Sequence, residues 1–89
     1  MPVISMFYGI VIAMYSLDNK KHKLPHIHVS YQDQEAIFEI PTGNLLEGEL
    51  KPNKLKLVHA WIEIHQEDLM ADWGLAIKGE SIFKIEPLK

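Results

Sequence analysis

The sequence contains neither cysteine nor arginine, and its positive charge comes from nine lysines. The absence of cysteine excludes disulfides, thiolate metal ligands and cysteine nucleophiles, and it suits a reducing compartment such as the cytoplasm. Arginine is the residue best suited to bidentate recognition of phosphate and guanine. Its absence, together with a formal net charge of −3, argues against tight nucleic-acid binding. We therefore expect a cytoplasmic protein for which nucleic acid is a weakly supported partner.

Long hydrophobic runs are also missing. The most apolar stretch, Met6–Tyr15, is too short to cross a bilayer and has no basic region before it, so we expect neither a membrane span nor a secretory leader. Of the 89 residues, 47% are hydrophobic and 24% are charged, as in ordinary globular proteins. These values predict one domain over residues 1–89 with a single modest core.

Alternation of apolar and polar residues with period two predicts β-strands in the first part of the chain. The predicted strands are Phe7–Ser16, His26–Tyr31, Glu35–Ile40 and Leu45–Leu50. Leu17–Leu24 separates the first two as a polar loop with a cluster of lysines. Gly48 interrupts the last strand and marks either a β-bulge or a close approach of another backbone.

The second and third strands predict a hairpin with a two-residue turn at Asp33-Gln34. In that register Val29 faces Phe38 on an apolar side, and His28 faces Glu39 on a mostly polar side. Such sorting is what a sheet with one face on a hydrophobic core requires.

Large side chains at spacings of three and four predict a helical segment after Pro52. The stripe comprises Leu55, Val58, Ile62, His65, Leu69, Trp73 and Ile77. One straight helix of this length would span ~35 Å at ~1.5 Å per residue, which is too long for so small a domain. We expect a bend or break near His65–Asp68, where acidic residues suit a new helix N-terminus. Gly79 is a suitable helix stop, and Trp61, at the edge of the stripe, is expected to be half exposed.

Together these elements predict an α+β fold: a small antiparallel sheet of four to five strands, with a bent helix or two consecutive helices packed on one face. The other face would mix apolar and polar side chains, from Val11, Ala13, Tyr15, His26, His28, Ile37 and Glu39. No predicted element covers that face, which makes it a natural docking surface for another chain. Its candidate binding residues are Tyr15, His26, His28, Ile37 and Glu39.

The pair His26 and His28 also raises the question of chemistry. With His65 or Glu39 as a third ligand, the two histidines could hold a metal ion. Only two of these ligands are local, so we expect neither a resident metal nor a cofactor. Beside Glu39, a histidine could act as a general acid or base, so His26, His28 and Glu39 are the candidate catalytic residues. A polar cross-strand pair that contributes less than about 1 kcal/mol is the plainer explanation. Whether the protein is an enzyme stays open.

Several segments carry a family resemblance. They are Pro2–Tyr15, Pro25–Val29 with Tyr31, Gly48–Leu50, the residues Trp61, His65, Leu69 and Trp73, and Lys84–Leu88. In order and spacing they resemble the prokaryotic family known only as domain of unknown function 4160. The resemblance implies a gene that often lies beside a second small gene, in a toxin–antitoxin-like pair, and it supplies no catalytic residue. Ala13 stands where the family usually has a basic residue, which further weakens nucleic-acid binding.

Three functions are compatible with these observations. The first is a partner-binding component of a two-gene, toxin–antitoxin-like module, with its partner encoded by the adjacent gene. The second is a small histidine- or metal-dependent hydrolase or ribonuclease, and the third is a structural homodimer joined through the uncovered face. We prefer the first because Val11, Ala13 and Ile37 stand where a merely solvated face would carry lysine, threonine or glutamate.

Overall fold

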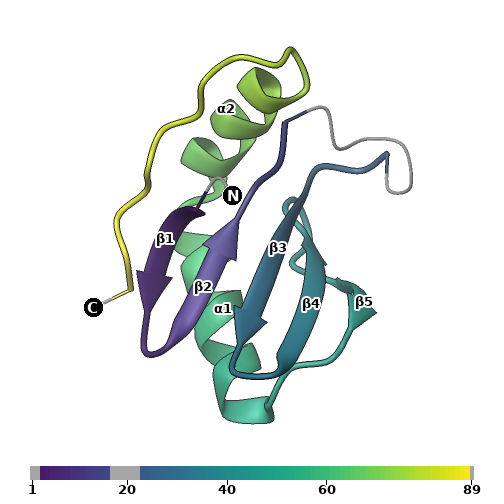
Figure 1. The fold of residues 1–89 in the computed structure, drawn as a ribbon, viewed down its shortest axis with the longest axis vertical. Helices are drawn as coiled ribbons and strands as arrows, with labels where there is room; N and C mark the ends of the chain where they lie inside the picture. The colour runs from purple at the N-terminus through teal and green to yellow at the C-terminus, as the bar shows by residue number, and fades with distance from the viewer. Residues whose placement is uncertain (1–2, 17–22, 89) are drawn as a thin grey trace.

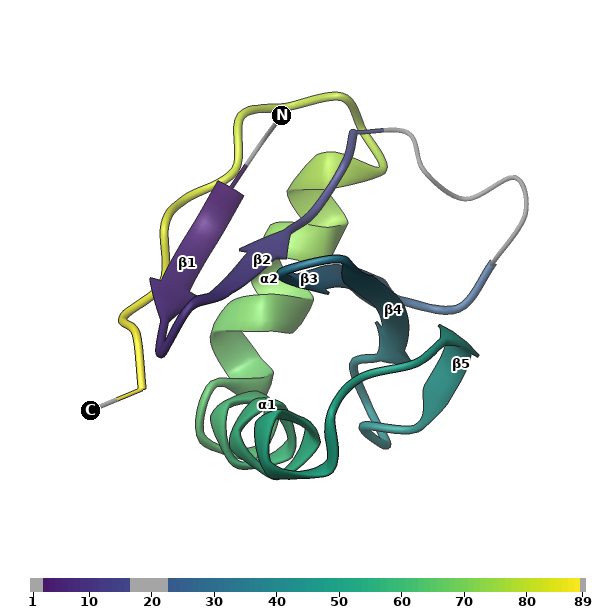
Figure 2. The same ribbon diagram turned by 60° about the horizontal axis from the view of Figure 1, so that its bottom comes forward.

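The computed structural model describes residues 3–16 and 23–88 (Figure 1). It shows a five-stranded antiparallel sheet, in which the strands lie in chain order, and two helices on one side of that sheet (Figures 1 and 2). The strands are β1 (Val3–Phe7), β2 (Ile10–Ala13), β3 (His26–Tyr31), β4 (Gln34–Glu39) and β5 (Leu45–Gly48), and the helices are α1 (Pro52–Ile64) and α2 (Gln66–Ala76). The predicted α+β fold is thereby confirmed.

Most of the loop predicted over Leu17–Leu24 lies outside the described residues. Within the described ranges, neither helix is long and apolar enough to cross a membrane.

The prediction of one strand over Phe7–Ser16 is wrong, because Tyr8 and Gly9 turn the chain and create the β1–β2 hairpin. Phe7 then pairs with Ile10 across a two-residue loop. The loop residues have positive φ angles, 50° for Tyr8 and 79° for Gly9, as a type I′ turn requires. Glycine adopts positive φ angles readily, whereas tyrosine seldom does. Tyr8 therefore does not signal a turn, and the apolar run has the sequence pattern of a continuous strand.

The β3–β4 turn falls at Gln32 and Asp33, one residue earlier than predicted, and Gln32 takes the positive φ of 54°. The register pairs Tyr31 with Gln34, Ser30 with Glu35, Val29 with Ala36, His28 with Ile37, Ile27 with Phe38 and His26 with Glu39. Each partner thus moves by two residues from its predicted position, which leaves every side chain on its predicted face. Val29 and Phe38 are both buried as expected, but the predicted pairings of Val29 with Phe38 and of His28 with Glu39 are wrong.

The helical stripe is broken at His65, as the sequence predicts. His65 ends α1 with φ −109° and ψ 27°, and α2 begins at the next residue with Glu67 and Asp68 in its first turn. Carboxylates at that position interact favourably with the partial positive charge of the helix N-terminus. Gly79, with a φ of 74°, then turns the chain away from α2, and the C-terminal segment runs back beside β1, where the Ile85 N–H donates to the Ile4 carbonyl.

The core lies between the sheet and the two helices. It includes Ile10, Ile12, Ile27, Phe38, Val58, Ile62, Leu69 and Trp73. Trp61 is also fully buried, with 0% of its surface exposed, so the expectation of half exposure is wrong. Its ring lies 5.5 Å from that of Phe7, and its indole N–H donates to the Glu86 carbonyl at 2.8 Å. The C-terminal segment therefore covers a flank of α1 that the helical pattern alone leaves at the edge of the core.

Asp72 is a buried carboxyl on α2, with 3% of its surface exposed. Its Oδ1 accepts a hydrogen bond from the Phe83 backbone N–H at 3.1 Å, whereas its Oδ2 has no hydrogen-bond partner among the described residues. Burial raises the pKa of Asp72 above its usual value, the Phe83 N–H lowers it, and the negative charge of Asp68 raises it further. Burial dominates, so the fold favours the protonated acid.

We expect the substitution Asp72→Asn to stabilise the protein near neutral pH. The stability that the raised pKa contributes is fully present below the unfolded-state pKa, near 3.8, and is lost as the pH rises through the folded-state pKa. An uncharged amide has no such pH-dependent loss. The free energy of unfolding of the variant should therefore exceed that of the natural protein by on the order of 1 kcal/mol at about pH 7. Thermal melts at several acidic pH values measure the difference in stability between the two proteins, which should disappear below about pH 4. A difference that grows on acidification would contradict the assignment.

Candidate functional site

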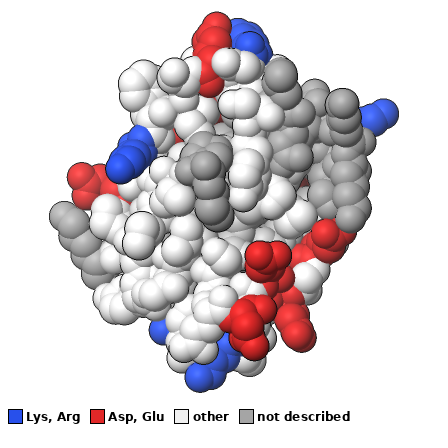
Figure 3. Space-filling model, in the orientation of Figure 1, with Lys and Arg blue, Asp and Glu red and all other residues white. Residues whose placement is uncertain are grey.

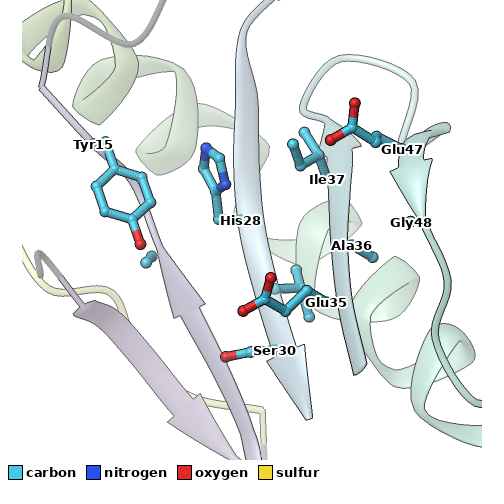
Figure 4. A pocket seen from close by; sticks show the side chains of 10 residues that line it. Tyr15, His28, Ser30, Glu35, Ala36, Ile37, Glu47 and Gly48 are labelled. Atoms are coloured by element: carbon cyan, nitrogen blue, oxygen red, sulfur yellow. The ribbon is translucent and has the colours of Figure 1, made fainter. Parts of the chain in front are cut away.

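The sheet face opposite α1 and α2, hereafter the uncovered face, contains a hollow of about 410 Å³ (Figure 4). In the described part of the chain, no helix packs on this face (Figures 1 and 2). The hollow is lined by Ala13, Tyr15, His28, Val29, Ser30, Glu35, Ala36, Ile37, Glu47 and Gly48. Strand register explains this grouping, because Ala13 pairs with His28, His28 with Ile37, and Ile37 with Glu47.

Tyr15 and His28 form an aromatic wall on the β2–β3 side of the hollow. Their ring centroids are 4.6 Å apart and their planes are nearly perpendicular, at 88°. This edge-to-face arrangement is the one that aromatic quadrupoles favour. Ala13, which pairs with His28, has a small side chain and so leaves room for the Tyr15 ring beside the imidazole.

His26 lies behind this wall and not in the hollow. It is 1% exposed, and its Nδ1 lies 2.7 Å from the Leu24 carbonyl oxygen, to which it donates. Its ring centroid is 5.4 Å from that of His28 and 4.9 Å from that of Trp73. β2 ends at Ala13, opposite His28, so at His26 the sheet has lost that neighbour and α2 can reach the imidazole. The alternation of side chains along β3 does not by itself reveal that β2 ends before it reaches His26.

The carboxylates of the hollow are Glu35 and Glu47, two exposed residues that sequence reasoning missed as site residues. Glu39, the predicted one, is half-buried opposite His26 and lies outside the lining. Alternation with Ile37 could have indicated Glu35. Glu47 could not be placed without the β4–β5 pairing, whose register shifts between Ile37 and Phe38.

Charge is unevenly distributed over the uncovered face. Figure 3 shows acidic side chains gathered over β3 to β5, whereas the surface over β1 and β2 is largely uncharged. Figure 4 shows the Glu35 carboxylate extending over β3 and the Glu47 carboxylate lying near Ile37. The hollow therefore offers an aromatic wall of Tyr15 and His28, an apolar floor at Ile37 and Ala13, and two carboxylates.

The three histidines considered for a metal site do not converge. His65 lies at the junction of α1 and α2, where its Nδ1 is 3.7 Å from an Asp68 oxygen and its ring is 5.4 Å from that of Trp61. Among the described residues, no group of three or more histidine, aspartate or glutamate side chains is arranged to hold a metal ion. The expectation of no resident metal stays a prediction. The acid–base hypothesis loses its proposed pair, because Ile37 takes the place opposite His28.

A family model described as a domain of unknown function (DUF4160) matches residues 9–74, and the protein belongs to this family. The matched region extends from the β1–β2 turn into α2, so it includes every residue that lines the hollow. No curated protein and no solved structure matches the chain.

Gly48 closes the β5 side of the hollow and confirms the predicted close backbone approach. Its φ is +84°, and a Cβ at this position would lie 2.2 Å from the Glu35 carbonyl oxygen and 2.9 Å from the Ala36 Cα. Both contacts are with backbone, which cannot move aside without disturbing the β4–β5 ladder. A residue with a side chain is therefore excluded by conformation and by space.

We expect Gly48→Ala to destabilise the protein by roughly 2 kcal/mol or more, because it combines strain with a backbone clash. Gly74→Ala is the matched control. A Cβ on Gly74, within α2, would meet nothing within 4 Å, so this change should be neutral or stabilise by up to about 1 kcal/mol. Urea denaturation measures both effects, and equal stabilities of the two variants would refute the interpretation of Gly48.

Proposed function

We propose that the protein is a partner-binding component that docks a second protein chain on its uncovered face. The observation that carries this proposal is the hollow with its aromatic wall and apolar floor. Aromatic side chains are enriched where proteins bind one another, and binding energy concentrates in central pockets surrounded by polar groups. Tyr15 and Ile37 are half-buried in the hollow, so each still has apolar surface that a partner would remove from water.

The apolar surface continues from the hollow across β2 to β1. Val11 pairs with Ser30, which lines the hollow, and Met6 pairs with Val11. Met6 is 64% exposed, and methionine is a residue that adaptable binding surfaces often use. A contiguous apolar surface bordered by carboxylates is typical of an interaction site.

We further propose that the partner is encoded by the adjacent gene, in a prokaryotic toxin–antitoxin-like module that acts in the cytoplasm. The family resemblance supports the gene pair, and the lack of cysteine suits that compartment. A hydrolase is the weaker candidate. His28 lies opposite Ile37, and His26, which lies opposite Glu39, is 1% exposed and donates to the Leu24 carbonyl. A homodimer through the same face is tested by the experiment below.

A substitution that fills the hollow without changing the charge of the protein should weaken docking. Ile37→Trp places a bulky neutral side chain in the hollow on a strand, where tryptophan is well tolerated. We expect it to weaken copurification with the co-expressed neighbouring gene product at least about tenfold, which corresponds to ~1.4 kcal/mol. The matched control is Ile64→Trp, at the end of α1, where the side chain is 65% exposed.

Circular dichroism and thermal melts establish that both variants are folded. Binding by the natural protein and by Ile64→Trp, but not by Ile37→Trp, supports the proposal. Equal binding by all three proteins would remove the hollow from the interface. A stable dimer of the natural protein that Ile37→Trp separates into monomers, with no capture of the neighbour, would replace the proposal by the homodimer.

A further inference from the structure

We infer that the C-terminal segment, residues 80–88, is a pH-dependent latch that opens when the buried carboxyl group of Asp72 ionises. The segment belongs to no helix or strand, and it runs beside β1 in the same direction as that strand (Figures 1 and 2). None of its residues is among the described residues that line the hollow, so the latch and the proposed docking surface are separate.

The segment is attached to β1 more weakly than a sixth strand would be. Among the described residues, one backbone hydrogen bond joins the two, from the Ile85 N–H to the Ile4 carbonyl at 2.8 Å. In a parallel pair the next donor of the segment would be residue 87, which is a proline and has no N–H. A groove of about 430 Å³ is lined by residues 3–6 of β1 and residues 84–87 of the segment, so packing between the two is incomplete. The segment can therefore detach without breaking a strand ladder.

Gly79 provides a hinge for such an opening. It is exposed and has a φ of 74°, and because glycine adopts positive and negative φ about equally readily, a change there can move the segment away and leave α2 intact. Opening also has a cost, since Ile85 is only 8% exposed and the Trp61 indole N–H would lose the Glu86 carbonyl. This cost keeps the latch closed while Asp72 is protonated.

The contact that responds to pH is the one between Asp72 and Phe83. Asp72 Oδ1 accepts from the Phe83 N–H at 3.1 Å, whereas its Oδ2 is buried with no hydrogen-bond partner among the described residues. A buried carboxylate oxygen without a donor costs free energy once it is charged. Because Phe83 belongs to the segment, opening removes the cover from Asp72 and lets water solvate its charge. Ionisation of Asp72 therefore favours the open latch.

The pH dependence of the latch belongs to Asp72 and not to its neighbours. The charged and titratable side chains on the surrounding elements are Asp68 on α2, His65 at the α1–α2 junction, His26 on β3, and Glu80, Lys84 and Glu86 on the segment. Burial is the largest cause of the raised pKa of Asp72, and Asp68 is the one of these groups whose charge raises it further. The three charged residues of the segment are exposed, so water solvates them whether the latch is open or closed. Opening should thus increase as the pH rises through the pKa that Asp72 has in the closed state.

The test is hydrogen exchange followed by NMR at several values between about pH 4 and about pH 7. Each rate is expressed as a protection factor, the ratio of the unprotected to the observed exchange rate, which removes the pH dependence of the exchange chemistry itself. The reporters are the Ile85 amide and the Trp61 indole N–H, whose hydrogen bonds exist only when the latch is closed. The reference is the Val29 amide, in the central strand β3.

In the natural protein we expect both reporters to be at least about tenfold less protected than Val29 at every pH, because the latch opens without unfolding of the sheet. Their protection should fall several-fold from the lowest to the highest pH. In Asp72→Asn, which preserves size and removes the ionisable group, it should stay constant within about twofold. The matched control is Glu80→Gln, which removes one negative charge at an exposed position of the segment itself and should keep the natural pH dependence.

Three results would overturn the latch. Equal protection of the two reporters and Val29 would show that the segment opens only when the whole protein unfolds. Protection of the reporters that does not change with pH in the natural protein would remove the coupling to ionisation. A fall in protection that persists in Asp72→Asn, or that disappears in Glu80→Gln, would assign the pH dependence to a group other than Asp72.

Discussion

Burial of one face of the sheet against α1 and α2 is the interaction on which the rest of the structure depends. Ile12, Val29 and Phe38 from three adjacent strands, together with Val58 and Leu69 from the helices, belong to one continuous core. A chain of this length can build only one such core. The other face of the same sheet is consequently left to carry the hollow, and its side chains are those that alternate with the core residues.

The hollow and the core are joined at the end of β3. Trp73 belongs to the core, His26 contacts Trp73, His28 contacts His26, and Tyr15 contacts His28. A succession of packed rings fixes the aromatic wall in place more firmly than surface side chains on an isolated strand would be fixed. The buried His26 thus packs between the aromatic wall and the core.

Much of the fold follows from sequence patterns, and the errors have local causes. Period two placed Ile27 and Val29 on the core side and His28 on the other, and these faces survived a register error because the pairing moved by two residues. The break at His65 followed from the length of the stripe and the acidic residues after it. The turn at Tyr8 was missed because a positive φ at tyrosine leaves no signal in an apolar run.

The sequence by itself determined which strand side chains point toward the helices and which point away from them, because alternation along each strand is a local property of the backbone. Only the tertiary structure decided which residues of the uncovered face meet. Glu47 joins Ile37 through the irregular β4–β5 pairing, Trp61 is buried by the C-terminal segment, and His26 is enclosed where β2 ends. These contacts join residues that are distant in the chain, so their geometry depends on turn conformations and strand ends that no periodic pattern encodes.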